Sequence, residues 1–547
     1  MRFSAILAAQ LRRRCNSEQA TRAPPAIYHQ NTFLESVRNP ALEAGRTPSE
    51  SLEILESGRA IISGLSTNIN DDVLKLEILN PNLYSRYRVL REKVLDISQA
   101  NVGNEEDNRK NLTRQLPERS SPVDSRLPYK AVRQNFAVLD EFDKLEHEIR
   151  CLPGLSRFQL PPSSDQIMSM ASIGPVVCFN VTEFRSDAIL ITKSKISSTQ
   201  LSNLRYSDLE SMAQLLTGAN RVTASNYLGS KVERNRPLLD LLRWLWKVAV
   251  KPVLEDLDLL IQPQLDLRKL PRVYWMASGA MGMMPLHAAG IHESGSTENT
   301  MSHIVSTYIT TLNAFAYARE RSSKRIKFSE QRLFVVAMPT TPGKRPIKAM
   351  EEVGVIEKVY ARFGACSGPD VLKHPSESDV KEKMPQCTVA HFACHGNSDA
   401  GNPSKGGLFL GHADASVAEH LSIAELTAMR PQDAYLSACS TAENLAEELV
   451  DEVIHTASRF QLLGFPHVIG TLWEAGNKEA LEIAREFYGS LIGSSVRKKD
   501  EALSDTVAYS LHEAVQTLRE SGTVGVRKRS DPQKDVISWA PFIHIGV

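Results

Sequence analysis

Two segments of the sequence end in side chains suited to acid–base and nucleophilic chemistry. Val389–Asp399 reads VAHFACHGNSD and places His395 directly before Gly396, whereas Ala434–Thr441 reads AYLSACST and contains Cys439. Each segment begins with a short apolar run bounded by small or turn-forming residues, which indicates a buried strand of a parallel sheet. Ligand crevices in open α/β sheets lie outside the carboxyl ends of the strands. The sequence therefore predicts an imidazole and a thiol at one edge of a shared sheet.

This pair of side chains is suited to acyl transfer through a thioester. A free thiol has a pKa of about 8.5, so Cys439 needs a neighbouring base or a favourable local field to become a thiolate. His395 can supply that base and then protonate the leaving amine as a general acid. The missing side chain of Gly396 lets a substrate carbonyl approach the backbone, where N–H groups near Gly396 and Cys439 can hold an oxyanion. Peptide hydrolysis is the simplest reaction of this kind.

The other cysteine and histidine residues have simpler interpretations. His391 and Cys394 lie inside the same apolar run as His395 and are expected to be core residues. His455 is expected at a helix surface or boundary. The chain has seven cysteines and no C-x-x-C pair, which argues against a disulfide framework and against a structural zinc site. We therefore predict no cofactor, no metal and a reducing, intracellular compartment.

Length and charge limit the other function classes. With 547 residues the chain is expected to form two or three domains. Lysine plus arginine and aspartate plus glutamate number 64 each, so no global field favours nucleic acid as a partner. No apolar run approaches the roughly 18 residues of a membrane span, so no membrane is predicted and a cytoplasmic location is expected. Met1–Cys15 is arginine-rich and acid-free, as in a mitochondrial presequence, although an ordinary basic terminus explains it more simply.

The pattern of apolar residues changes along the chain. Residues 1–150 form a helical N-terminal region with a polar linker at Ser98–Tyr129, with helices expected near Leu52–Leu65, Leu83–Ile97 and Ala131–Ile149. From residue 151 the pattern becomes α/β, beginning with a hairpin of Val176–Val181 and Ala188–Thr192. After residue 330, strands at Leu333–Met338, Val389–Cys394, Ala434–Cys439 and Val468–Trp473 alternate with helices. Such alternation predicts parallel βαβ units, and the chain is expected to end in a Trp-Ala-Pro turn.

Several separated motifs together resemble one known family. They are WMASGAMGMMPLHAAG at Trp275–Gly290, VSTYITTL at Val305–Leu312, HFACHG at His391–Gly396, LSACST at Leu436–Thr441, DEVIHTASRFQLLGF at Asp451–Phe465 and VIGTLW at Val468–Trp473. In this order they resemble the CHAT family, a branch of caspase-like cysteine peptidases often fused to tetratricopeptide helices. The resemblance covers roughly Ala171–Val547, and Ser49–Ile97 is similar to helices that precede the domain in longer members.

The resemblance implies a caspase-like α/β/α sandwich around a mainly parallel sheet, preceded by a helical N-terminal region. Residues 151–330 would form a degenerate companion half and residues 331–547 the catalytic half. His395 matches the family histidine, Cys439 the nucleophile, and Gly396 the glycine whose amide helps form the oxyanion hole. The implied partners are a protein or peptide substrate and a possible protein activator bound through the N-terminal helices. Where members commonly carry acidic residues after the tryptophan of the VIGTLW strand, this chain has Glu474–Asn477, which leaves its cleavage preference open.

The sequence also bears on two function classes other than a peptidase. The helical extension and the altered loop after Trp473 are also compatible with a catalytically silent interaction or scaffolding protein. A nucleotide-binding α/β protein is disfavoured because Pro342-Gly343-Lys344 lacks the leading glycine of a phosphate-binding loop. The leading hypothesis from the sequence is a caspase-like cysteine endopeptidase.

Overall fold

The structure is a computed structural model that divides into two compact units, Met1–Pro162 and Ser163–Val547. The described residues are 46–53, 55–56, 71–94, 127–160, 162–216, 230–260, 266–322, 332–363, 368–397, 407–422, 425, 435–438, 465–497, 503–521 and 535–547.

The first unit is helical and has a small core of its own. Its described helices include α4 (Asp71–Leu79), a helix over 81–94 and α6 (Leu127–Arg150). The Asn80 side chain accepts the backbone N–H of Leu83 at 3.1 Å, which caps the helix over 81–94. Inside the unit, the Tyr87 ring lies 5.5 Å from that of Phe142 and 5.1 Å from that of Phe158. The helical N-terminal region predicted from the sequence is therefore present, while most of the predicted polar linker lies outside the described residues.

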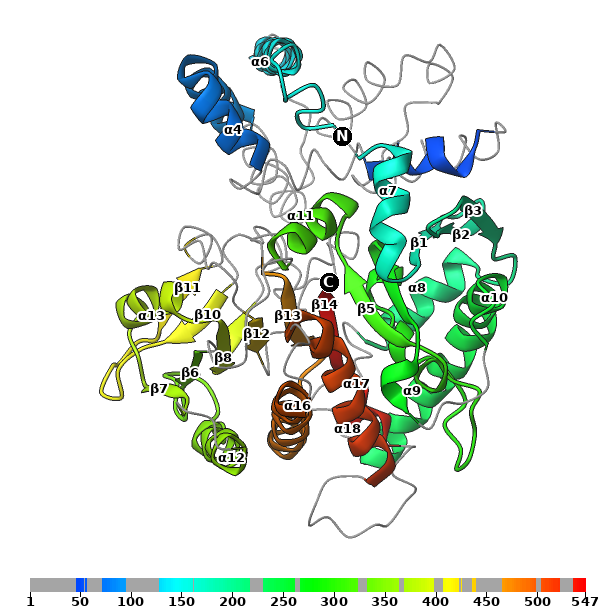
Figure 1. The fold of residues 1–547 in the computed structure, drawn as a ribbon, viewed down its shortest axis with the longest axis vertical. Helices are drawn as coiled ribbons and strands as arrows, with labels where there is room; N and C mark the ends of the chain where they lie inside the picture. The colour runs from blue at the N-terminus through cyan, green and yellow to red at the C-terminus, as the bar shows by residue number, and fades with distance from the viewer. Residues whose placement is uncertain are drawn as a thin grey trace, which may run out of the picture. The chain divides into compact units, whose positions relative to one another are not determined.

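An 11-stranded sheet with the order β3-β2-β1-β4-β5-β14-β13-β12-β8-β6-β7 forms the centre of the second unit (Figure 1). The strands are β1 (Val176–Val181), β2 (Ser186–Ile191), β3 (Ile196–Gln200), β4 (Arg272–Met276), β5 (Val305–Ile309), β6 (Leu333–Ala337), β7 (Asp370–Lys373), β8 (Val389–Ala393), β12 (Tyr435–Ala438), β13 (His467–Thr471) and β14 (Phe542–Gly546). All neighbours pair in parallel except β1–β2, β2–β3 and β13–β14. The predicted α/β/α fold class with a mainly parallel sheet is confirmed.

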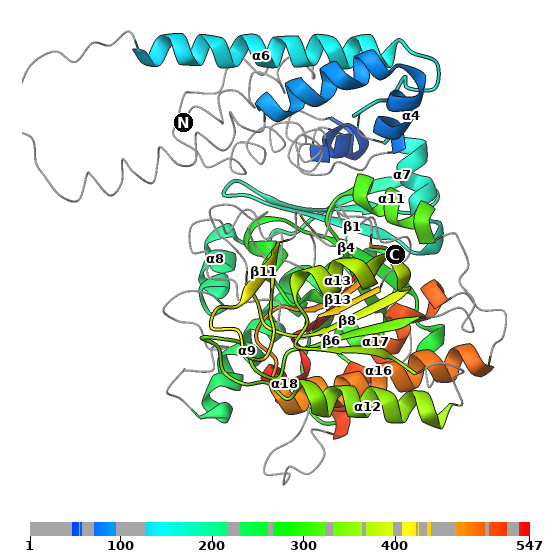
Figure 2. The same ribbon diagram turned by 90° about the vertical axis from the view of Figure 1, so that its left-hand side faces the viewer.

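Helices cover both faces of this sheet. Helix α12 (Ala349–Arg362) leads from β6 out to the edge strand β7, and α13 (Glu377–Lys383) leads from β7 back to β8. Right-handed crossovers that run in opposite directions along a sheet place their helices on opposite faces. Figure 2 accordingly shows α12 and α13 with the strands between them. On the α12 side, α16 (Asn477–Arg497) packs against both α12 and α17 (Leu503–Ser521).

Further helices accompany the strands that come first in the chain. They are α7 (Ser164–Met170), α8 (Tyr206–Gln214), α9 (Lys231–Leu245), α10 (Lys251–Asp256) and α11 (Leu312–Ser322). Helix α9 begins at a capping box in which Ser230 and Glu233 bond each other's backbone N–H groups, and it continues into α10 through a π-helical turn at Trp246–Val250. Residues Lys231–Asp256 thus form one continuous helical segment.

The end of the chain differs from the sequence-based expectation. Instead of finishing in a turn, it forms α18 (Val536–Trp539) and then strand β14. This strand lies between β5 and β13, antiparallel to β13, so the last residues of the chain occupy the middle of the sheet. A Cβ added at Gly546 would lie 2.0 Å from the carbonyl oxygen of Pro466, which shows how closely the two backbones approach. The short Phe542–Gly546 run follows a proline and has no helix after it, so alternation alone did not indicate a strand.

A second, 3-stranded sheet follows β8 directly. Its order is β11-β10-β9, and its strands are β9 (Gly396–Asn397), β10 (Gly407–Leu410) and β11 (Glu419–Ser422). The strand at Gly407–Leu410 belongs to this small sheet and not to the large one. Because β9 begins at Gly396, the small sheet holds the backbone immediately after His395.

Candidate active site

The two strands predicted to carry the reactive side chains are direct neighbours. Strands β8 and β12 pair in parallel, from Val389 opposite Tyr435 to Phe392 opposite Ala438. Both strands therefore end at the same edge of the sheet. Strand β12 ends one residue before Cys439 in the sequence, and Cys439 itself lies outside the described residues. The described part of the candidate site consequently comprises His395, Gly396 and the segments that hold them.

The imidazole of His395 is oriented by a backbone carbonyl group. Its Nε2 lies 2.7 Å from the carbonyl oxygen of Arg345. A carbonyl oxygen can only accept a hydrogen bond, so Nε2 carries the proton and the neutral ring has its lone pair on Nδ1. The backbone of His395 is fixed as well, because its carbonyl oxygen accepts the N–H of Phe409 at 2.9 Å. The side chain is half-buried, so the ring is held in one orientation and still reaches the surface.

The carbonyl group of Arg345 is positioned by a tight turn after β6. In this turn the N–H of Lys344 donates to the carbonyl oxygen of Thr341 at 3.0 Å. Pro342 precedes Gly343, whose φ is +72°, and this combination defines a type II turn. The Pro342-Gly343-Lys344 sequence is thus a turn that presents the next carbonyl group to His395. The sequence carried the turn signature, but nothing in it indicated that a main-chain oxygen would orient the imidazole.

The backbone N–H of Gly396 points away from the small sheet. Gly396 lies opposite Leu408, and the flanking N–H of Phe409 bonds to the carbonyl of His395. In an antiparallel ladder this pattern identifies Gly396 and Leu408 as a non-hydrogen-bonded pair, whose own N–H groups point outward. The Gly396 amide is therefore not used by β10, as an oxyanion-binding donor requires.

His391 and Cys394 are core residues, as predicted. His391 is fully buried, with Nε2 3.0 Å from the Glu352 carboxylate in a contact poorly aligned for a hydrogen bond, and with Nδ1 3.2 Å from the Tyr488 hydroxyl. Burial, reinforced by the nearby Glu352 charge, raises the pKa of the Cys394 thiol to about 12. At neutral pH this thiol is protonated and out of reach of a substrate, so Cys394 is not a competing nucleophile.

Comparison with known proteins places the chain in a family. The model of the CHAT domain matches residues 239–547, which is more than half of the chain. The chain belongs to the CHAT domain family. No curated protein matches it.

Among solved structures the CHAT domain protein is similar to three structures at low identity. The separase–securin complex of Saccharomyces cerevisiae matches at 10% identity over 94% of this chain and 43% of the separase chain, with a TM-score of 0.44. The Arg-specific cysteine proteinase gingipain R matches at 8% identity over 57% of this chain and 74% of that chain, with a TM-score of 0.33. The complex of RgpB pro- and mature domains from Porphyromonas gingivalis matches at 9% identity over 57% of this chain and 76% of that chain, with a TM-score of 0.36. The chain spans less than half the length of the separase chain.

In this CHAT domain, the loop after Trp473 is joined to the loop that carries Arg345. Trp473 is buried and its indole N–H donates to the carbonyl of Ile537 at 3.2 Å, whereas Glu474 is exposed. Asn477 accepts the backbone N–H of Lys348 through its side-chain oxygen at 3.3 Å. The altered Glu474–Asn477 segment therefore contacts the same loop that orients His395, which places it beside the candidate site.

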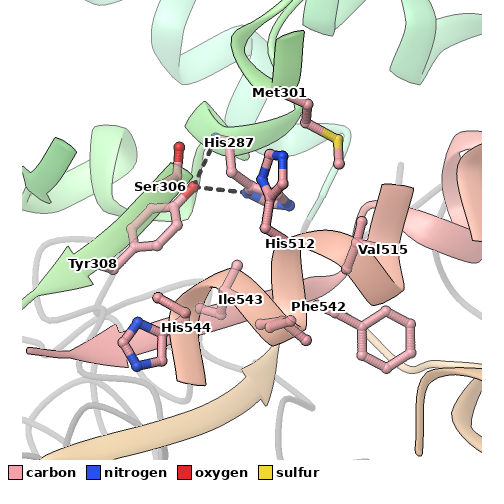
Figure 3. A pocket seen from close by; sticks show the side chains of 11 residues that line it. His287, Met301, Ser306, Tyr308, His512, Val515, Phe542, Ile543 and His544 are labelled. Carbon is pink, nitrogen blue, oxygen red and sulfur yellow. Dashed lines mark hydrogen bonds between the residues drawn. The ribbon is translucent and has the colours of Figure 1, made fainter. Parts of the chain in front are cut away.

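A small, mainly apolar cavity lies in a different part of the CHAT domain (Figure 3). It measures about 30 Å³, room for about two water molecules, and its lining includes His287, Tyr308 and His512. The Nε2 of His287 donates to the carbonyl of Ala540 at 3.1 Å, so its Nδ1 accepts the Tyr308 hydroxyl at 2.9 Å. Burial lowers the pKa of His287 to about 3 and that of His512 to about 4. These histidines are neutral packing groups that the sequence did not single out.

Within the described ranges, no group of three or more His, Cys, Asp and Glu side chains is arranged to hold a metal ion. None of the helices that the structure describes combines the length and the apolar character needed to cross a bilayer.

Proposed function

We propose that this CHAT domain protein is a cysteine endopeptidase that cleaves peptide bonds through a Cys439–His395 dyad. The observation that carries the proposal is the placement of His395. Its ring is oriented by the Arg345 carbonyl at the end of β8, directly beside the parallel strand whose sequence continues into Cys439. The proposal includes a companion half at residues 151–330 and a catalytic half at 331–547.

The tautomer of His395 determines the proton transfers. Because Nε2–H is engaged by the Arg345 carbonyl, Nδ1 is the atom that takes the proton from the thiol of Cys439. The thiolate attacks the substrate carbonyl carbon, and Nδ1–H then protonates the departing amine as the C–N bond breaks. A water molecule gives its proton to Nδ1 while its oxygen attacks the thioester, which releases the acid product and restores the thiol.

The proposed oxyanion hole uses the backbone N–H groups of Gly396 and Cys439. The outward direction of the Gly396 amide supports this role, since the amide is not used in the pairing with β10. A glycine at this position also has no side chain to obstruct the substrate carbonyl. Donors fixed before the reaction stabilise the developing charge without reorganisation.

Labelling with a peptidyl acyloxymethyl ketone tests the proposal directly. The full-length protein is expected to form one thioether adduct on Cys439, detected by mass spectrometry of the digested protein. Cys439→Ala is expected to abolish the adduct, and His395→Ala to slow its formation strongly, because the thiol then has no base. Cys151→Ser is the matched control, since Cys151 is an exposed thiol in the helical unit and its loss should leave labelling unchanged. Equal labelling of the wild type and Cys439→Ala would refute the nucleophile assignment.

A second candidate function is a scaffolding role in which the helical unit binds a protein partner. This alternative is favoured by the exposure of Ile78 (82%) and Leu79 (56%) on a unit that already has its own core. The same surface suits a protein activator of the peptidase. Cells that express Cys439→Ala in place of the wild type distinguish the two functions: full cellular function without the thiol supports scaffolding, and loss of function supports catalysis.

A further inference from the structure

Two exposed cations lie on the loop that orients His395. Lys344 ends the type II turn and Arg345 supplies the carbonyl group bound by the imidazole. Both side chains are exposed, and neither forms a salt bridge with any residue that the structure describes. Exposed cations are usually solvated and carry no function, so the position of these two relative to the imidazole decides whether they can act at the site.

The ammonium group of Lys344 is placed near His395 by two independent connections. Along the chain, Lys344 directly precedes the residue whose carbonyl oxygen lies 2.7 Å from the His395 ring. Across the small sheet, Lys344 Nζ lies 4.9 Å from the ring centroid of Phe409, whose N–H bonds to the His395 carbonyl at 2.9 Å. The cation–π contact reduces the freedom of an otherwise flexible side chain. The ammonium group is therefore held close to the site and does not simply extend into solvent.

Two carboxylates on adjoining segments have partners of their own. Glu351 binds Lys348 at 2.6 Å, and Glu419 accepts the backbone N–H of Glu377 at 2.6 Å. On the neighbouring strand β10, Phe409 contacts the ring of His420 at 5.4 Å, so the surface beside Lys344 is aromatic and cationic. A basic group over an aromatic surface, beside a proposed catalytic imidazole, suits a carboxylate on the substrate.

We propose that Lys344 is a specificity-determining residue that binds an acidic side chain of the substrate close to the cut bond. The inference rests on the proposed peptidase function and adds a substrate class to it: peptides with glutamate or aspartate near the cleavage site. Arg345 extends the same positive surface through its exposed guanidinium. The substrate carboxylate supplies the anionic partner that Lys344 lacks among the described residues.

A series of matched peptidyl acyloxymethyl ketones tests this inference on the full-length protein. In each pair, glutamate replaces glutamine at one position of the peptide, and the second-order rate of Cys439 alkylation is measured. At one position the glutamate probe is expected to react about two- to fivefold faster, the size expected of an exposed charge pair. This preference should disappear in Lys344→Gln and reverse in Lys344→Glu. Lys195→Gln, which removes an exposed lysine from a hairpin turn of the companion half, should retain it.

A binding measurement separates failure of this inference from failure of the proposed function. Fluorescein-labelled peptides with the same glutamate–glutamine exchanges are titrated against the Cys439→Ala protein, and anisotropy is recorded at low and high salt. If no ketone labels Cys439 but the glutamate peptide binds in a Lys344-dependent, salt-sensitive manner, the peptidase function fails and the acidic-peptide site stands. The inference would be overturned if the glutamate and glutamine probes alkylate the wild type at equal rates and the corresponding peptides bind Cys439→Ala equally.

Discussion

His391 and His395 belong to the same short segment, yet their surroundings differ completely. His391 is fully buried between a carboxylate and a tyrosine hydroxyl, and both of its ring nitrogens face protein groups. His395 is half-buried, and one of its nitrogens is held by a main-chain oxygen. The difference shows how this fold separates histidines that stabilise the core from a histidine suited to exchange protons with a substrate.

The centre of the sheet extends the same comparison. There a hydrogen-bonded row crosses four neighbouring strands, from Arg272 Nη2 to Thr307 Oγ1 at 2.9 Å, then to His544 at 3.1 Å and from His544 to His467 at 3.0 Å. Arg272 can only donate, so the Thr307 hydroxyl accepts from its guanidinium, and the imidazoles of His544 and His467 continue the row. Burial, together with the Arg272 charge, holds the pKa of both histidines well below 6.5. These imidazoles link strands and stay neutral, unlike the role proposed for His395.

The largest expected effect is the loss of reactivity in His395→Ala. Removing the general acid–base group should slow peptide cleavage and Cys439 alkylation by about 10²- to 10⁴-fold. The thermal midpoint should remain close to that of the wild type, because the ring is half-buried and is hydrogen-bonded to a loop carbonyl. Stopped-assay kinetics and calorimetry on the same samples measure the two effects. A variant that loses its folded structure along with its reactivity would contradict the contrast with His391.

His391→Ala should lower the stability of the protein and leave the reactivity of Cys439 nearly unchanged, the reverse of His395→Ala. This change leaves the buried Glu352 carboxylate and Tyr488 hydroxyl without their shared imidazole and creates a cavity in the core. The expected loss of stability is about 2–4 kcal/mol. Urea unfolding followed by tryptophan fluorescence measures the loss, and alkylation of Cys439 below the unfolding transition should proceed at a rate within a few-fold of the wild type. His391→Gln keeps a hydrogen-bonding group at this position and should cost less. If His391→Ala abolishes alkylation while the protein remains folded, His391 takes part in the site.

Acidification should lower the stability of the folded protein through its buried histidines. Burial lowers the pKa of His287 and His292 to about 3 and that of His512 to about 4, from a usual value of 6.5. Below about pH 6.5 the unfolded chain binds protons that the folded protein does not. The contribution of these neutral histidines to the free energy of unfolding is therefore fully present above that pH and decreases as the pH falls toward the lowered pKa values. Each such histidine contributes a slope of up to about 1.4 kcal/mol per pH unit. Thermal midpoints from pH 7 to pH 5 should decrease, and less steeply in His512→Leu, whereas identical slopes would show that His512 is already protonated in the folded state.

The sequence predicted those parts of the fold that depend on local patterns. The strands at Leu333–Met338 and Val389–Cys394 agree with β6 and β8 to within a residue, and α12 follows β6 as the predicted alternation requires. In these segments apolar periodicity and burial agree, because each is a regular element of a parallel βαβ unit. That β8 and β12 end at the same edge of one sheet also agrees with the general rule for parallel sheets.

The remaining features depend on contacts between distant segments. Strand β14 lies in the centre of the sheet only because it pairs with β13 and β5. Strand β3 has the polar sequence ISSTQ and lies at the edge of the sheet. At the candidate site, the reactive residue types were recognisable from the sequence. The main-chain oxygen of Arg345 was not, since a backbone carbonyl leaves no side-chain signature. The assignment of Cys439 continues to rest on its sequence position and on the family resemblance.

The smallest expected effects come from two matched glycine substitutions. Gly343 and Gly154 both follow a proline, have φ of +72° and +80°, and offer open space where a Cβ would be added. In both turns the following N–H donates to the carbonyl three residues earlier, from Lys344 to Thr341 and from Leu155 to Leu152. Alanine at either position should therefore destabilise its own unit by about 1 kcal/mol through backbone strain alone.

Only Gly343→Ala should also change reactivity, because its turn positions the Arg345 carbonyl that orients His395. A several-fold decrease in the rate of Cys439 alkylation is expected for Gly343→Ala, with no change for Gly154→Ala, whose turn lies in the helical unit. The rates are measured at 10 °C to keep both variants folded, and calorimetry gives the two stability losses. Equal rates in the two variants would mean that the imidazole keeps its orientation without this turn, and the role given to the Arg345 carbonyl would have to be abandoned.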